Sequence, residues 1–202
     1  MRVFALVAAI LALLAAACAD RSAQPDHQAE WRQVLEHKKA AASPDATSAQ
    51  KQVYADSVRA FVVKHPNHGR AREVWHRMQI EFAGELSSLG RYQDAIRFYR
   101  AVLAHDRTND AAQRGMELAL DRLAVTRDKL LALEKGMSHR EVASILGKPV
   151  PGWTVENERP GARMEAWYYR MHGGGLAAVY FRNGEVLAAE TTAHERLGRL
   201  GS

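Results

Sequence analysis

The sequence predicts an α+β protein, in which antiparallel helical hairpins precede a small domain of one helix and a three-stranded antiparallel sheet. Between residues 47 and about 133, apolar residues recur at three- and four-residue steps, the spacing of amphipathic helices. After Gly136 the pattern changes to short β-like runs, two of which flank Asn183-Gly184, the strongest short signal for a β-hairpin. An antiparallel sheet with helices gathered on one face belongs to the α+β class.

Composition and charge limit the classes of protein to which the chain can belong. The chain has 202 residues, 47% of them hydrophobic and 25% charged, which is an average globular mixture. This excludes a wholly disordered chain, a collagen, a disulfide scaffold and a multi-span membrane protein. The net charge of +5 is modest and spread along the chain, so it does not require a nucleic-acid partner. The single cysteine, Cys18, excludes an internal disulfide.

The start of the chain predicts an export signal. Arg2 supplies a positive charge, and residues 3–17 contain no charged or polar side chain. This stretch is shorter than the ~20 residues of a helical membrane span and ends in small residues, as a cleavable signal peptide does. We therefore expect residues 1–17 to be cleaved off and to take no part in the fold. The polar composition that follows predicts a tether over residues 18–46, with a short helical piece around residues 31–39.

The end of the apolar stretch, LAAAC at residues 14–18, resembles the lipobox of bacterial lipoproteins. In that family the cysteine thiol is alkylated with diacylglycerol, the chain is cleaved just before it, and the new amine is acylated. The resemblance implies lipidation of Cys18. Ala19 stands where an Asp would retain such a lipoprotein in the inner membrane, so the resemblance also implies the outer membrane, on its periplasmic face. The alternative is a secreted protein with an unmodified Cys18.

Four amphipathic helical segments are predicted in the middle of the chain, over residues 47–64, 74–89, 92–103 and 110–133. The first ends at the sequence HPNHG (residues 65–69). Helices joined by such short turns form antiparallel hairpins, the unit of α-solenoids.

One of these segments, GRYQDAIRFYRAVL at residues 90–103, resembles the second half of a tetratricopeptide repeat. In that comparison Ala95 is the small residue that lets two helices approach, and Tyr92 and Tyr99 fill the gap between them. The resemblance implies a tetratricopeptide-like region over residues 47–127. An ordinary helical bundle is the alternative.

Local signals place the C-terminal elements. Ser138 and Glu141 form a capping-box pattern that begins a helix, and Gly147 ends it. Three β-like runs follow, over residues 164–170, 176–182 and 185–192, joined by a triple glycine and by Asn183-Gly184. The polar segment 153–163 is predicted to be a loop.

The same region resembles the SmpA/OmlA domain, a small lipoprotein domain found in the E subunit of the outer-membrane β-barrel assembly machinery. The resemblance rests on LEKGMSHREVASILGKP (residues 133–149), on Trp167 and Tyr169, and on FRNGEV (residues 181–186), in that order. It implies an α+β domain over residues 128–193, followed by a tail over residues 194–202. It also implies the barrel-assembly machinery as a partner.

Catalytic and metal-binding patterns are not found in the sequence. His65 and His68, with His76 nearby, suggest a metal site, but Pro66 denies them a common helical face, so a solvated turn is the better interpretation. The chain has no nucleophile elbow, phosphate-binding glycine loop or His-Glu-x-x-His sequence. We therefore expect no enzymatic activity, no cofactor and no metal.

Partner contacts are predicted on the first β-like run. Side chains alternate across a strand, so Trp167 and Tyr169 are expected to pack toward the helices, while Tyr168 and Arg170 point outward. In a sequential three-stranded sheet this strand lies at an edge. Tyr and Arg are enriched in binding hot spots, which makes Tyr168 and Arg170 the candidate partner contacts.

These expectations converge on a non-enzymatic, lipid-anchored scaffold or docking protein in outer-membrane protein assembly or envelope maintenance. The alternative is a tetratricopeptide-type adaptor lipoprotein for another process of the cell envelope. An enzyme acting on cell-wall material is disfavoured, since no paired carboxylates or nucleophile–base set stands out.

Overall fold

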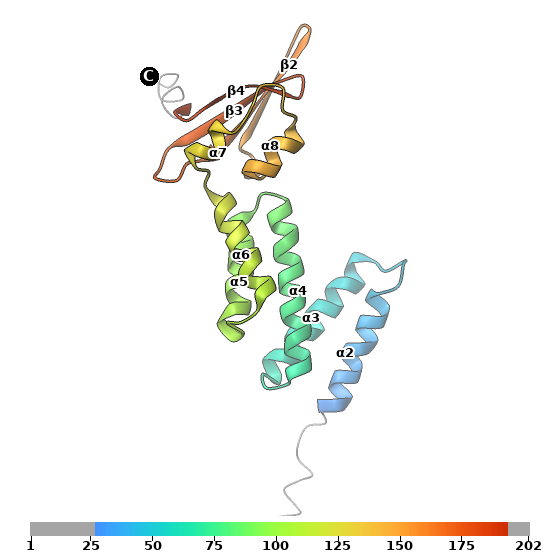
Figure 1. Ribbon diagram of the computed structural model, residues 1–202. Helices are drawn as coiled ribbons and strands as arrows, with labels where there is room; N and C mark the ends of the chain where they lie inside the picture. The colour runs from blue at the N-terminus through green and yellow to red at the C-terminus, as the bar shows by residue number, and fades with distance from the viewer. Residues whose placement is uncertain (1–26, 194–202) are drawn as a thin grey trace, which may run out of the picture. The chain divides into compact units, whose positions relative to one another are not determined.

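The computed structural model describes residues 27–193, apart from the side chain of Arg159, and shows helices followed by one antiparallel sheet (Figure 1). The helices are α2 (His27–Ala41), α3 (Ser48–Lys64), α4 (Gly69–Ser88), α5 (Tyr92–His105), α6 (Asp110–Leu123), α7 (Arg127–Leu131) and α8 (His139–Leu146). The strands are β1 (Thr154–Arg159), β2 (Ala162–Arg170), β3 (Leu176–Arg182) and β4 (Glu185–Glu190). The α+β class is therefore confirmed.

The chain divides after Trp75 into two compact units. The division falls within α4, so the second unit contains the rest of α4, the helices α5 to α8 and the whole sheet. In the first unit α2 packs on α3 through four buried side chains, Trp31, Val34, Val58 and Phe61. Thr47 and Gln50 form a capping box that starts α3 within one residue of the predicted boundary.

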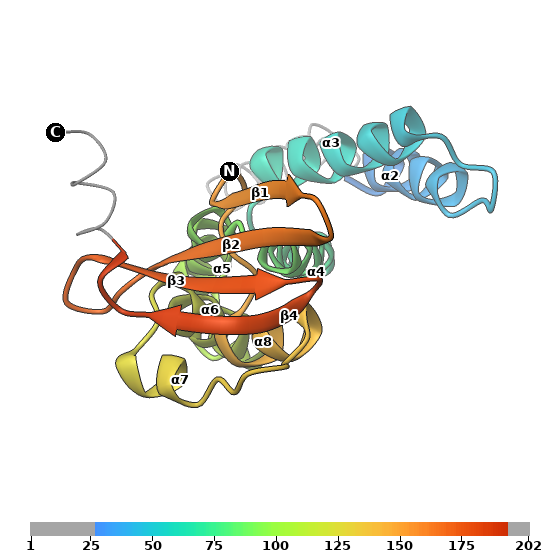
Figure 2. The same cartoon turned by 90° about the horizontal axis from the view of Figure 1, so that it is seen from above.

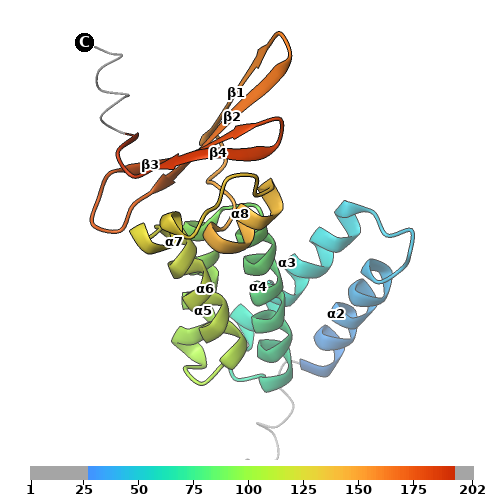
Figure 3. The same ribbon diagram turned by 45° about the horizontal axis from the view of Figure 1, so that its top comes forward.

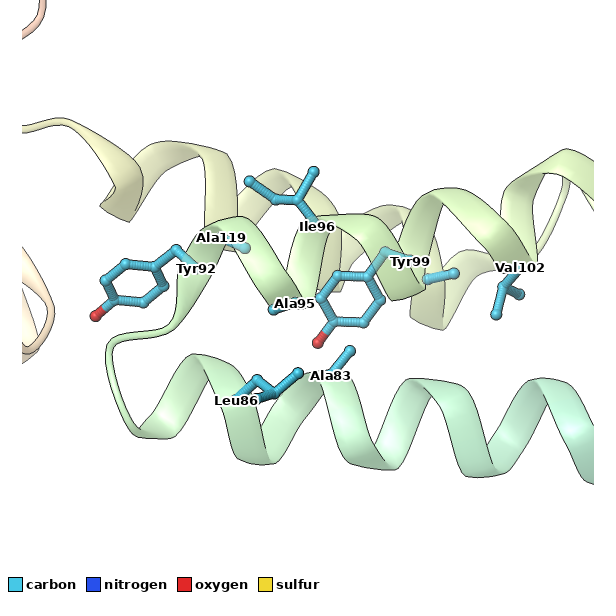
Figure 4. Close-up of a cluster of buried hydrophobic side chains, with 9 residues drawn as sticks. Ala83, Leu86, Tyr92, Ala95, Ile96, Tyr99, Val102 and Ala119 are labelled. Atoms are coloured by element: carbon cyan, nitrogen blue, oxygen red, sulfur yellow. The ribbon is translucent and has the colours of Figure 1, made fainter. Parts of the chain in front are cut away.

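The helical core of the second unit lies between α4, α5 and α6. Its buried residues are Ala83, Leu86, Tyr92, Ala95, Ile96, Tyr99, Val102, Ala112 and Ala119. Figure 4 shows Ala83 and Ala95 on the facing sides of α4 and α5, with the Tyr99 ring beside them. The small side chains allow the two helices to approach, as expected for Ala95, and the tyrosines fill the space around them.

The predicted helix over residues 110–133 is wrong, because the structure divides it into α6 and α7. Ala124 and Val125 leave the helical path, and the backbone of Val125 pairs with the end of β2: its N–H donates to Arg170 O at 2.8 Å, and its C=O accepts from His172 N at 2.9 Å. Thr126 then caps α7. This long-range pairing replaces helical hydrogen bonds that the local sequence would allow.

The sheet has four strands in the order β1-β2-β3-β4, each antiparallel to its neighbour, which corrects the prediction of three. The additional strand, β1, lies in the segment predicted to be a loop. Its sequence TVENER has a single strongly apolar residue, Val155, which is 57% exposed, so it lacks the alternation that marks a half-buried strand. Pairing with β2 along its whole length holds it in the sheet.

The turn and cap signals of this region are confirmed. Ser138 and Glu141 form the capping box of α8, and Gly147 ends the helix with φ +83°. Asn183 (φ +53°) and Gly184 (φ +88°) have the positive values of a type I′ turn between β3 and β4.

One face of the sheet packs on the helices of the second unit. Tyr169, Val179, Phe181 and Val186 from the sheet share a core with Val142 and Leu146 of α8 and Leu130 of α7. Figure 3 shows α7 and α8 on the same side of the sheet, and Figure 2 looks onto the opposite face, with α5, α6 and α8 behind the strands.

Candidate docking groove

The sequence-predicted contact residues lie on a strand whose position differs from the prediction. Tyr169 is buried and Trp167 packs against the same core, so the assignment of these two residues to the helix-facing side is confirmed. The edge position is wrong: β2 lies between β1 and β3, and the backbone N–H of Tyr168 donates to Trp153 O at 2.9 Å. Cys18 lies outside the described residues.

A groove of about 410 Å³ lies in the second unit, where the start of α5 meets the sheet. Residues 90–94 form one wall, together with Leu123 at the end of α6. The other wall consists of Val150, Pro151 and Trp153, with Arg170 from the end of β2. Arg170 therefore lines this groove, and Tyr168 does not.

Close contacts fix the helical wall against the segment that follows α8. Gly90 has φ +78°, and a Cβ at this position would lie 2.4 Å from Pro149 O, so only glycine fits here. The hydroxyl of Tyr92 donates to Lys148 O at 3.0 Å, and the hydroxyl of Tyr169 donates to Gly147 O at 3.0 Å. Burial raises the pKa of Tyr92, so its phenol stays protonated as a donor at neutral pH.

The aromatic wall is also held by backbone hydrogen bonds. The N–H of Trp153 donates to Val150 O at 2.9 Å, which closes a turn through Pro151 and Gly152. Its C=O accepts from Tyr168 N at 2.9 Å, at the point where β1 begins to pair with β2. The backbone that carries the half-buried indole is thus fixed, and Trp153 lines the same groove as Arg170.

Charge is distributed unevenly around the groove. Arg91 pairs with Asp94 at 2.6 Å, and Arg97 pairs with the other oxygen of the same carboxylate. Hydrogen bonds from Arg91 and then Arg97 hold the pKa of Asp94 below its ordinary value. Arg170 is exposed, and no ion pair joins it to another residue within 27–193. The groove therefore offers one cation that is not neutralised.

The histidine turn departs from the predicted solvated turn at His65 and in part at His68, which is half-buried with its ring centroid 5.2 Å from that of Trp31. Pro66 and Asn67 are exposed, as expected, but His65 is only 8% exposed, with its Nε2 2.8 Å from Glu30 Oε2 and its ring centroid 4.6 Å from that of Phe61. Hydrogen bonds from Lys64 and then His65 hold the pKa of Glu30 below its ordinary value. Glu30 lies on a different helix, which a reading of local spacing could not find.

Metal binding finds no support in this turn or elsewhere in the described part of the chain, where no three His, Cys, Asp or Glu side chains could together hold a metal ion. The groove itself brings together apolar surface, an ion pair and a free guanidinium. This arrangement suits binding.

Sequence reasoning missed most of the groove. The sequence predicts only helix packing for Tyr92 and a loop for Trp153. Both walls come from segments far apart in the chain, so their meeting has no local signature. The run GKPVPGW (residues 147–153) is the signal that could have drawn attention, since its prolines and glycines impose a fixed turn before an aromatic residue.

Comparison with models of protein families, with curated proteins and with solved structures finds no match to the chain. Among the residues that the structure describes, no helix is both long and apolar enough to cross a membrane.

Proposed function

We propose that the chain is a non-enzymatic docking protein of the bacterial cell envelope, anchored through lipid on Cys18 to the periplasmic face of the outer membrane. Its partners are envelope proteins that take part in outer-membrane protein assembly or envelope maintenance. The anchor is supported by the lipobox-like sequence at residues 14–18. The cellular process is supported by the resemblance of residues 129–192 to the SmpA/OmlA domain.

The groove is the observation that carries the docking function. Its walls are fixed by hydrogen bonds, and an exposed arginine stands beside a tryptophan and a proline. Trp and Arg are the residue types most enriched in binding hot spots, and a wall that is already ordered loses little entropy when a partner binds. Of the two residues predicted from sequence, Arg170 has the better claim because it lines the groove.

The helical hairpin supports a second candidate, a tetratricopeptide-type adaptor for another envelope process. Phe82 and Leu89 of the α4–α5 segment are 47% and 57% exposed, and Phe82 stacks edge-on against Phe98 of α5 with ring centroids 5.0 Å apart. Exposed aromatic surface on such a hairpin is suited to bind a peptide.

The anchor is tested by Cys18→Ala. Because Cys18 is the only cysteine, the variant has no thiol to alkylate, and we expect it to leave the outer-membrane fraction. Fractionation of cells with quantitative immunoblotting measures this. Ser22→Ala, a small change just beyond the lipobox-like sequence, is the control and stays with the membrane. Equal retention of the two variants would overturn the lipoprotein proposal.

The docking function is tested by photo-crosslinking in intact cells. A benzoylphenylalanine replaces Gln93 in the groove, Phe82 on the hairpin, or Gln113 near the opposite end of α6 as the control. We expect adducts with barrel-assembly or other envelope proteins from position 93. Adducts from position 82 alone would favour the adaptor, and position 93 behaving like position 113 would overturn docking through the groove.

A further inference from the structure

The guanidinium of Arg170, which has no ion-pair partner among residues 27–193, defines what the groove lacks. The other charges on its walls already form an ion pair, since Arg91 and Asp94 are 2.6 Å apart. A guanidinium is a planar fork that binds a carboxylate through two parallel hydrogen bonds. The groove that Arg170 lines also has apolar surface from Trp153, Pro151 and Leu123. A ligand complementary to this surface carries one carboxylate with an apolar group beside it.

We propose that the groove binds an extended peptide segment of a partner protein, in which an Asp or Glu side chain adjoins a large apolar side chain. The carboxylate pairs with Arg170, and the apolar side chain lies against Trp153 and Leu123. This inference rests on the proposed docking function and names the chemistry of the partner.

The charge balance favours a single carboxylate over a phosphate or a cluster of acids. Among residues 27–193, Arg170 is the one cation lining the groove that has no ion-pair partner, since Arg91 is already paired with Asp94. Phosphate recognition relies on several donors or cations that converge on one group. A polyanion such as a phosphorylated lipid headgroup would therefore leave charge unbalanced here.

The binding surface is held in place before a ligand arrives. Hydrogen bonds fix the main chain at Arg170 and Trp153: the carbonyl of Arg170 accepts from Val125 N at 2.8 Å, and Trp153 is bonded through both its N–H and its C=O. A groove of about 410 Å³ lies in the range of sites that enclose small ligands, so it has space for a few side chains but not for a folded domain. The part of a partner that enters the groove is thus a short segment.

The first experiment identifies the sequence preference. The full chain, purified in dodecyl maltoside, is applied to an array of synthetic seven-residue peptides that are acetylated and amidated, so that only side chains carry charge. We expect the bound peptides to share an Asp or Glu next to Trp, Phe, Leu or Ile. Bound peptides without an acidic residue, or with a basic one at that place, would overturn the proposal.

The second experiment assigns the carboxylate to Arg170. Fluorescence anisotropy measures the Kd of the best peptide and of its counterpart with the acid replaced by the amide, for the wild type and for Arg170→Gln. We expect either change alone to weaken binding about tenfold and the two together to weaken it no further than one, because both remove the same contact. Additive losses would overturn the pairing.

The matched control is Arg182→Gln. Arg182 is also an exposed arginine at the end of a strand, and it pairs with Met164 at the opposite end of β2. We expect this variant to keep the wild-type Kd. A loss of affinity equal to that of Arg170→Gln would mean that the effect of Arg170→Gln comes from the change in net charge and not from a specific contact. Trp153→Ala is expected to weaken both peptides, and circular dichroism melts of each variant verify that it folds.

This inference and the docking function can fail separately. If no acidic peptide binds while position 93 still crosslinks to envelope proteins, the peptide proposal is wrong and docking through the groove stands. Vesicles of phosphatidylglycerol provide a further test. If they compete with the peptide for the wild-type protein but do not bind the Arg170→Gln variant, the occupant is a lipid and the proposal is overturned.

Discussion

Gly115 of α6 provides the space that the ring of Tyr99 occupies. A Cβ at residue 115 would lie 2.4 Å from Cζ of that ring, which is closer than any real contact allows. Tyr99 is almost fully buried among α4, α5 and α6, so its ring has no room to move aside. The absence of a side chain at Gly115 therefore sets how closely α5 and α6 pack.

Gly115→Ala is expected to destabilise the protein by about 1–3 kcal/mol, the usual range for overpacking a core, despite the better helix propensity of alanine. Gly84→Ala in α4 is the matched control, because a Cβ there meets nothing within 4 Å. That variant should gain up to about 1 kcal/mol. Urea unfolding followed by circular dichroism compares the two, and a stabilised Gly115→Ala would mean that the Tyr99 ring is free to shift.

Residues whose role depends on local periodicity could be predicted from the sequence. Ala95 is fully buried, and Trp167 and Tyr169 share the helix-facing side of β2, as strand alternation requires. The groove itself was not predicted: Arg170 is proposed from the sequence as an outward contact on an edge strand, and Trp153 lies in a predicted loop, whereas the place of both depends on segments distant in the chain. His65 was missed for the same reason, since Glu30 approaches it from another helix.

At the scale of elements, helices and turns with strong local signals were predicted closely, and elements created by long-range pairing were not. The segment over α6 and α7 has continuous helical periodicity, yet Val125 pairs with the end of β2 and interrupts it. Strand β1 has almost no apolar alternation, yet it pairs with β2 and is further joined to it by an Arg163–Glu156 ion pair of 2.7 Å. In both cases a tertiary contact overrides the local preference.

The turn between β3 and β4 offers a test of how a local signal sets an element. Gly184 has φ +88°, and a Cβ there would meet nothing within 4 Å. Gly184→Ala is therefore opposed by the backbone conformation alone, and we expect a loss of about 1–2 kcal/mol.

Gly69→Ala is the control for this turn. Gly69 also has open space around it, but its φ lies outside the left-handed region. The stability of the Gly69→Ala variant should therefore differ little from that of the wild type. Thermal melts of the two variants give the comparison. An unaffected Gly184→Ala would mean that the hairpin accepts another type of turn.

At the scale of the second unit, two tyrosines bond the helical hairpin and the sheet to the same short segment after α8. Tyr92 from α5 and Tyr169 from β2 donate to the consecutive carbonyls of Lys148 and Gly147. Each bond requires a protonated phenol. Burial raises the pKa of Tyr169 far above its ordinary value, and a negative charge on Tyr92 would raise it further.

These phenols predict how stability depends on alkaline pH. Below about pH 10 the Tyr169 phenol is protonated in both the folded and the unfolded protein, so it causes no pH dependence. Above that pH the unfolded chain releases the proton while the folded protein retains it, so the free energy of unfolding falls as pH rises. The contribution of Tyr169 to this fall approaches about 1.4 kcal/mol per pH unit.

Tyr169→Phe isolates that contribution. At pH 8 the variant should be less stable by about 1 kcal/mol, because the buried carbonyl of Gly147 loses its donor. Phenylalanine has no proton to retain, so its stability should fall less steeply above pH 10, and the difference between wild type and variant should shrink between pH 9 and pH 11. Urea unfolding at half-unit intervals measures this. A difference that stays constant across that range would show that Tyr169 ionises alike in the folded and unfolded protein, which would contradict the burial of its hydroxyl between sheet and helices.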